Sequence, residues 1–173
     1  QRLADRPSVS PVLQDYRDET GSYDRVLSIE MFEAVGMEYW DTFAANMSRL
    51  LAPGGVAGMQ VITMAESGFD SYMRNPDFIQ RYIFPGGMLP TVTHLTELMN
   101  RHEMKVSKVV RFGKDYARTL DMWRDQFNRQ WEDIQQHGVD ERFRRMWNYY
   151  LCYCITGFMQ GITDVVQIRI EKS

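Results

Sequence analysis

The apolar positions of the chain switch between the spacing of a helix and the short continuous runs of buried strands. Residues 26–29 form an apolar run after a turn-like segment, and residues 39–51 place apolar side chains at helical spacing. Pro53-Gly54-Gly55 ends the helical pattern, and residues 56–64 form a second apolar run. A strand, a helix, a stop and a strand in this order predict a βαβ unit with a right-handed crossover and parallel strands.

The rest of the pattern extends this unit into a larger sheet. In order, we expect a short strand at 9–16 interrupted by Pro11, irregular chain over 68–90 with a short helix near 77–82, a helix at 91–104, a strand at 105–113, helices at 116–138 and 140–161, and an alternating strand at 162–173. These elements predict a mixed α/β sheet that has a terminal antiparallel strand and a helical insertion before it.

Length and composition fit a single domain that neither spans a membrane nor binds nucleic acid. The 173 residues are within the usual size of one domain, and the net charge of −3 gives no basic field for nucleic acid. The longest nearly apolar run, residues 54–65, is far shorter than the ~20 residues of a membrane span. Twelve Met, nine Phe, nine Tyr and four Trp suit either an apolar pocket or simply a large core.

Neither the cysteines nor the histidines suggest a metal site. Cys152 and Cys154 are two residues apart, so on a helix they point to different sides and suit neither a disulfide nor a metal clip. This arrangement suggests a reducing compartment. His94, His102 and His137 each stand alone without the spacing of paired ligands, so we expect them to be structural or surface residues.

Candidate chemistry is expected at the carboxyl ends of the strands, where open α/β sheets bind their ligands. Asp15 and Tyr16 suit hydrogen bonding and stacking on a ring, or equally a turn acid followed by a partly buried tyrosine. Glu33 follows a buried strand, where its carboxylate either binds a ligand or caps the next helix. We expect Glu30 to be solvated rather than catalytic.

Gln60 is a polar residue inside an apolar strand. Burying an amide without partners costs about 1 to 3 kcal/mol, so this side chain requires a backbone or ligand partner.

The segment RYIFPGGMLPTV, residues 81–92, is too apolar for a simple surface turn and contains Pro and paired Gly, which interrupt a helix. It therefore predicts a shaped loop that lines something apolar.

Several segments together resemble a known family. The segments YDRVLSIEMFEAVG (23–36), LLAPGG (50–55), FIQRYIFPGGMLP (78–90) and RMWNYYLCYCITGF (145–158) follow one another in the order and spacing of the cyclopropane-fatty-acyl-phospholipid synthase family, relatives of the mycolic acid cyclopropane synthases. The resemblance covers almost the whole chain, and the combination of YIFPGG with YYLCYC is highly specific.

The resemblance implies a class I S-adenosylmethionine-dependent methyltransferase, Rossmann-like α/β fold that is incomplete at its N-terminus. The Gly-rich turn with which the family begins this domain is absent from the sequence. Residues 1–173 would then be the C-terminal part of one methyltransferase domain, in which about 68–100 and 114–160 line the acyl substrate. We expect such a chain alone to bind S-adenosylmethionine poorly and to be inactive.

The implied reaction transfers a methyl group from S-adenosylmethionine to the cis double bond of a phospholipid acyl chain. Loss of a proton to a bound bicarbonate would give a cyclopropane or a methylene branch. The implied partners are unsaturated phospholipid acyl chains at the membrane surface, with a cytoplasmic location at the inner face of the membrane, and the resemblance allows a homodimer. The alternative is a truncated, non-catalytic lipid-binding or regulatory fragment.

The resemblance also assigns roles to single residues. Glu33 would anchor the bicarbonate, with the Ile62 backbone and the Tyr116 phenol completing its contacts, and Gln60 replaces a histidine ligand of close relatives. A neutral amide donates a hydrogen bond but takes no proton, so this replacement leaves the bicarbonate itself as the base. Ala34 replaces another histidine of the motif.

Three further residues match family positions. Tyr16 and Ile29 would border the adenosyl group, and Asp15 is expected to bind the cofactor beside them. Cys154 matches a cysteine assigned to the active site and suits a buried structural thiol equally well. Arg142, Arg144 and Arg145 suggest a membrane contact, although a solvated helix face explains them more simply.

Overall fold

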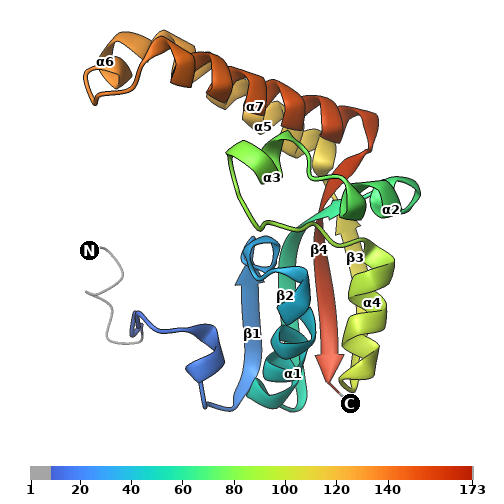
Figure 1. Cartoon of the computed structure of the whole chain (residues 1–173). Coiled ribbons are helices and arrows are strands. Elements are labelled where there is room, and N and C mark those ends of the chain that lie inside the picture. Colours follow the sequence, from blue (N-terminus) through green and yellow to red (C-terminus); the bar gives the residue numbers. More distant parts are fainter. Residues whose placement is uncertain (1–8, 173) are drawn as a thin grey trace.

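Four strands form one mixed sheet in the computed structural model, which describes residues 9–172 (Figure 1). The strands are β1 (Tyr23–Ile29), β2 (Leu51–Met64), β3 (Met104–Arg111) and β4 (Thr163–Lys172), in the order β1-β2-β4-β3. β1 and β2 run parallel, and β4 is antiparallel to both of its neighbours. The expected parallel pair and terminal antiparallel strand are therefore confirmed.

The helices follow the predicted order, but α2 and three short 3-10 helices are added, and the helix expected at 116–138 is divided into two. They are η1 (Tyr16–Asp18), η2 (Phe32–Ala34), η3 (Met37–Tyr39), α1 (Trp40–Leu50), α2 (Glu66–Arg74), α3 (Phe78–Tyr82), α4 (Val92–Arg101), α5 (Gly113–Arg129), α6 (Trp131–Gln135) and α7 (Glu141–Gln160). Asp140 caps α7 by accepting a hydrogen bond from the Phe143 amide, at 2.8 Å. Asp77 and Gln80 form a capping box at the start of α3.

One face of the sheet is covered by α1 and α4 and holds the main core (Figure 1). Alternate residues of β2, namely Ala57, Met59 and Val61, are buried there beneath Leu95 and Met99 of α4. α1 contributes Phe43 and Met47, and η2 contributes Phe32, to the same cluster. Burial of this apolar face is the main source of stability of the sheet.

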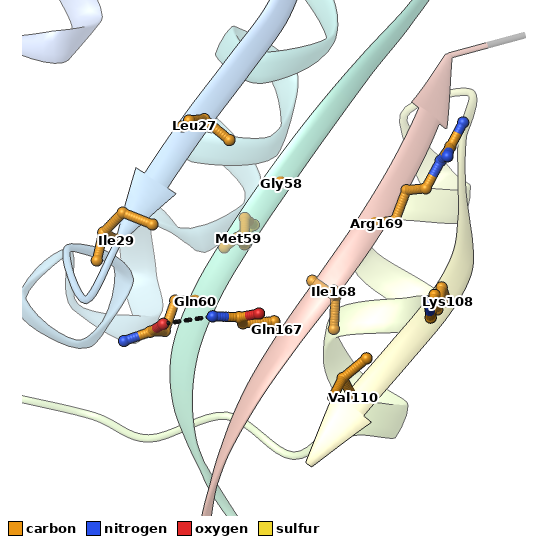
Figure 2. A pocket seen from close by; sticks show the side chains of 10 residues that line it. All are labelled: Leu27, Ile29, Gly58, Met59, Gln60, Lys108, Val110, Gln167, Ile168 and Arg169. Carbon is orange, nitrogen blue, oxygen red and sulfur yellow. Dashed lines mark hydrogen bonds between the residues drawn. The ribbon is translucent and has the colours of Figure 1, made fainter. Parts of the chain in front are cut away.

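The second face is covered at its upper end by the antiparallel pair α5 and α7 (Figure 1). Ile62 of β2 and Val165 of β4 pack there with Leu120, Leu151 and Phe158 of the two helices. Figure 2 shows the rest of this face, a shallow cavity of about 390 Å³ in which Gly58, Gln60 and Gln167 lie between exposed apolar and charged side chains. This uncovered part of the second face is called the open face below.

Two expectations about the local structure are wrong. Residues 9–15 form no strand, and among the described residues β1 is paired on one side alone. The segment expected to be irregular from residue 68 contains α2, since Phe69 turns into the core and gives this stretch a helical apolar face. The short helix expected near 77–82 is confirmed as α3.

Candidate active site

Glu33 is held where β1 ends, beneath the α5–α7 pair. The neighbouring Phe32 is fully buried and fixes η2 to the core, so that the Glu33 side chain turns toward β2. Its Oε1 accepts a hydrogen bond from the Ile62 amide at 2.6 Å, while its Oε2 is buried without a partner in the described part of the chain. Burial raises the pKa of Glu33, and the nearby Glu30 raises it further, although the Ile62 amide opposes both effects.

Glu30 is partly exposed and its carboxylate is held by two side chains of the protein, whereas the sequence suggested a solvated residue. Its Oε1 accepts a hydrogen bond from Gln60 Nε2 at 2.8 Å, and its Oε2 accepts one from the Tyr116 hydroxyl at 3.0 Å. The parallel register pairs Ile29 with Gln60, which places the following Glu30 beside Gln60. Glu30 also has a φ of 48°, a left-handed conformation that is uncommon for a residue other than Gly and is concentrated at functional sites.

Gln60 is half-buried, and its amide is paired with two side chains rather than with backbone or a separate ligand. Gln167 of β4 donates to Gln60 Oε1 at 2.9 Å (Figure 2). The Gln60 amide nitrogen is therefore free to donate to Glu30. A chain of hydrogen bonds therefore runs across three strands from Gln167 to Glu30. Gln167 and Glu30 were not among the predicted site residues; the amide inside an apolar strand was the signal that could have located both.

Tyr116 reaches the site from α5, although 86 residues separate it from Glu30. Its ring packs edge-on against Phe158 of α7, with 5.3 Å between ring centroids. Burial raises the pKa of Tyr116 to about 12, and the hydrogen bond to Glu30 and its charge act in the same direction. The phenol is therefore a proton-bearing donor at neutral pH and not a base.

Cys154 lies in α7, in the same apolar cluster as Ile62 and Tyr116. Burial raises the pKa of its thiol to about 11, while a hydrogen bond with Tyr150 opposes the shift. A protonated thiol is a poor nucleophile at neutral pH. These surroundings favour the structural interpretation of Cys154 over a chemical one.

The loop of residues 81–92 is connected to Glu33 through the backbone. The Met88 amide donates to the Glu33 carbonyl at 3.0 Å, and Phe84 packs edge-on against Tyr150 of α7 at 6.1 Å. Tyr82 and Phe84 are exposed. The loop is therefore joined to η2 through the backbone and to α7 through Phe84, and it presents exposed aromatic side chains to solvent.

The three residues expected at the adenosyl group do not form one cluster. Asp15 caps η1 and pairs with Arg17 at 2.7 Å, and this guanidinium lowers the pKa of Asp15 to about 2. Tyr16 packs against Phe43 at 5.7 Å. Ile29 lines the open face and is 60% exposed (Figure 2). Only Ile29 adjoins the carboxylates, as the immediate neighbour of Glu30.

Two kinds of feature are absent from the described residues. Over residues 9–172 no group of three or more His, Cys, Asp or Glu side chains is arranged to hold a metal ion. No helix in the described part of the chain combines the length and apolar character needed to cross a bilayer.

Comparison with known proteins identifies relatives of the whole chain. A family model described as mycolic acid cyclopropane synthetase matches residues 3–168. The tuberculostearic acid methyltransferase UfaA1 of Mycobacterium tuberculosis is 38% identical over 156 residues, which are 90% of this chain and 36% of the relative. The cyclopropane-fatty-acyl-phospholipid synthase of Escherichia coli is 36% identical over 165 residues, which are 95% of this chain and 41% of the relative.

Solved structures give the same result for the fold. A crystal structure of mycolic acid cyclopropane synthase CmaA1 complexed with SAH and CTAB superposes with a TM-score of 0.87 at 26% identity, covering 99% of this chain and 64% of that chain. The cyclopropane synthase MmaA2 from Mycobacterium tuberculosis superposes with a TM-score of 0.82 at 25% identity, covering 93% of this chain and 59% of that chain. The chain thus has the methyltransferase fold in part, and spans 36% and 41% of the length of the two curated relatives.

Proposed function

The chain belongs to the mycolic acid cyclopropane synthetase family, and from this premise we propose that it forms the part of an S-adenosylmethionine-dependent methyltransferase that binds the lipid and removes the proton. The observation that carries the proposal is the convergence of Glu30, Glu33, Gln60 and Tyr116 beside an aromatic loop. The substrate is a carbon–carbon double bond of an acyl chain, and the product is a cyclopropane or a methylene-branched chain.

The residues around the site suit a hydrocarbon guest. Tyr82 and Phe84 of the loop and Tyr149 of α7 are 64%, 56% and 54% exposed, which leaves their faces free to contact an apolar ligand. Methyl transfer to an alkene places a positive charge on the acyl chain, and both π-faces and carboxylates stabilise such a charge. The loop would supply the π-faces, and the two glutamates would supply the negative charge.

S-Adenosylmethionine would approach from the side of the open face. Ile29 adjoins Glu30 and lines the cavity there, so it suits a place beside the adenosyl group, as the resemblance implies. The expected contributions of Asp15 and Tyr16 stay predictions. The Asp15 carboxylate pairs with Arg17 of η1, and the Tyr16 ring packs against Phe43 of α1. Because so few cofactor contacts are preformed, we expect the 173-residue chain alone to bind S-adenosylmethionine weakly, as isothermal titration calorimetry would measure.

The lipid carrier is proposed from the name of the Escherichia coli relative, which specifies a fatty-acyl phospholipid. Unsaturated phospholipid chains would then be taken from the membrane surface, with the protein on its inner face. Arg142 and Arg145 are exposed and suit contact with anionic headgroups. Arg144 does not, because its guanidinium lies 5.2 Å from the Trp131 ring and bonds Asn128.

The proposal is tested by mass spectrometry of phospholipid acyl chains from cells that express this chain within its full native reading frame. We expect monounsaturated chains to gain one CH₂ group, and we expect no gain with the matched variant Glu33→Gln. Expression of residues 1–173 alone forms a third arm, in which we expect no gain. Absence of a gain in every arm would refute the proposed methyl transfer. The alternative, a non-catalytic lipid-binding or regulatory fragment, would then remain.

A further inference from the structure

The contacts of Glu30 show which group occupies the centre of the site. Gln60 and Tyr116 are the side chains that the resemblance assigns to a bound bicarbonate, yet both donate to the Glu30 carboxylate. The Gln60 amide cannot turn away without losing its bond from Gln167. The donors that would hold a separate anion are therefore already engaged by an anion of the chain itself.

The surrounding charge also disfavours a second anion. Glu33 lies close enough for the charge of Glu30 to raise its pKa, and its buried Oε2 has no donor within the described residues. A bicarbonate placed here would add another negative charge to two neighbouring carboxylates. The residues present thus do not fit bicarbonate, and they do fit Glu30.

We propose that Glu30 is a built-in catalytic base that takes the place of bicarbonate in this chain. This inference rests on the proposed function. The π electrons of the alkene form a bond to the methyl carbon of the sulfonium, and the carbon–sulfur bond breaks with its electron pair going to sulfur. The acyl chain is left as a carbocation.

Glu30 then removes one proton from the transferred methyl group. The released C–H electron pair closes the cyclopropane ring or forms a methylene double bond, and the proton resides on the carboxyl group until solvent takes it. Charge balances, because one sulfonium charge is lost and one proton is gained. Tyr116 and Gln60 hold the carboxylate oxygens in place throughout.

The backbone of Glu30 makes a clean test possible. A φ of 48° is easily adopted by Gly, so Glu30→Gly removes the carboxylate without straining the turn and leaves the Gln60 and Tyr116 donors facing an opening. Glu103 is a matched control, because it is also a glutamate with a positive φ, 60°, and lies exposed in the turn between α4 and β3. Glu103→Gly therefore makes the same substitution, at a similar backbone conformation, outside the site.

The experiment measures methyl transfer by the full native protein in buffer depleted of bicarbonate and again after bicarbonate is added. We expect the wild type and Glu103→Gly to change by less than about twofold on addition. We expect Glu30→Gly to be slower than wild type by about 100-fold or more in depleted buffer, the usual scale of a lost general base, and to regain at least about tenfold with bicarbonate. Glu30→Gln should stay inactive in both buffers, because its amide fills the opening but takes no proton.

The opposite results overturn the inference. A wild type that loses about tenfold or more on depletion uses bicarbonate, and a Glu30→Gly variant that is active without bicarbonate uses another base. Binding of ¹³C-labelled bicarbonate, observed by NMR, gives a readout independent of turnover: we expect exchange broadening with Glu30→Gly and none with wild type. Broadening with the wild type overturns the inference, whereas a wild type that transfers no methyl group in either buffer refutes the proposed function itself.

Discussion

The two faces of the sheet differ in kind although the same strands supply both. On the face beneath α1 and α4, the β2 residues Ala57, Met59 and Val61 are at most 1% exposed and wholly apolar. On the other face, the interleaved Gly58, Gln60 and Ile62 are only half-buried and include the amide that bonds Glu30. Alternate residues of β2 therefore face the apolar core and the candidate site.

This alternation explains why the register of β2 matters so much for the site. A shift by one residue would exchange the two faces, burying Gln60 in the core and turning Met59 toward the glutamates. The apolar face fixes the register, because misplacing its residues would expose the whole core. The covered face thus positions the catalytic candidates of the second face without contacting a substrate.

The largest effect is expected from Phe32→Ala on the covered face. Phe32 is fully buried and packs against Trp40 and Phe43, with ring centroids 5.3 and 5.0 Å away. Its truncation should lower the free energy of unfolding by about 3 to 5 kcal/mol, as measured by urea denaturation. The matched change on the open face is Leu27→Ala, where the side chain is 76% exposed and the expected loss is below about 0.5 kcal/mol.

Equal losses of unfolding free energy in these two variants would contradict the difference between the faces. Such a result would mean that another surface covers Leu27 in solution, and that the open face also contributes to stability.

A smaller effect, on activity alone, is expected from Tyr116→Phe on the second face. The change removes the donor to Glu30 but keeps the ring that packs on Phe158. Loss of a hydrogen bond to a charged group, worth about 1.5 to 3 kcal/mol, should slow methyl transfer by roughly 10- to 100-fold. The free energy of unfolding should fall by less, about 1 kcal/mol, because Glu30 keeps the Gln60 donor and its partly exposed carboxylate can bond water in place of the phenol. Initial rates and urea denaturation measure the two quantities.

Tyr23→Phe is the matched control for this change. Tyr23 also donates to a carboxylate, that of Glu19 at 2.8 Å, but it lies at the amino end of β1, away from the site. We expect wild-type rates from it. A large loss of stability in Tyr116→Phe, or equal slowing in both variants, would contradict the separation of the two roles.

The local pattern of apolar residues was sufficient to predict the sheet. The candidate site, by contrast, depends on contacts between elements that are far apart in the sequence. The βαβ unit and the final strand follow from apolar runs that are each read within a short window. The contacts of Glu30 depend on the register of β1 against β2 and on a tyrosine brought in from α5. Neither partner is near Glu30 in the sequence, so local pattern could not show that other side chains hold its carboxylate.

The strand expected at 9–16 failed for a related reason. Its alternation is compatible with a strand, but a strand also needs a neighbour, and β2 is the only described strand that pairs with β1. By contrast, Gln60 was predicted to need a partner on energetic grounds alone, and this prediction is confirmed.

The smallest effect is expected from Cys154→Ser, in the apolar cluster that closes the upper end of the second face. Because burial raises the pKa of this thiol from 9.0 to about 11, the folded state holds the thiol proton more tightly than the unfolded chain. The resulting stabilisation is complete below pH 9 and is lost as the pH rises toward 11. The serine variant lacks this loss, so wild type should fall in stability relative to it over that window.

At neutral pH the same variant should transfer methyl groups within about twofold of wild type, because a protonated thiol is a poor nucleophile. In residues 1–173 carrying Cys152→Ser, iodoacetamide reports Cys154 alone, and alkylation should be slow at neutral pH and accelerate only as the pH nears 11. Fast alkylation at pH 7 together with loss of methyl transfer in Cys154→Ser would instead place a thiolate in the site. The helix α7 would then contribute a catalytic group to the second face as well as the side chains that pack against the sheet.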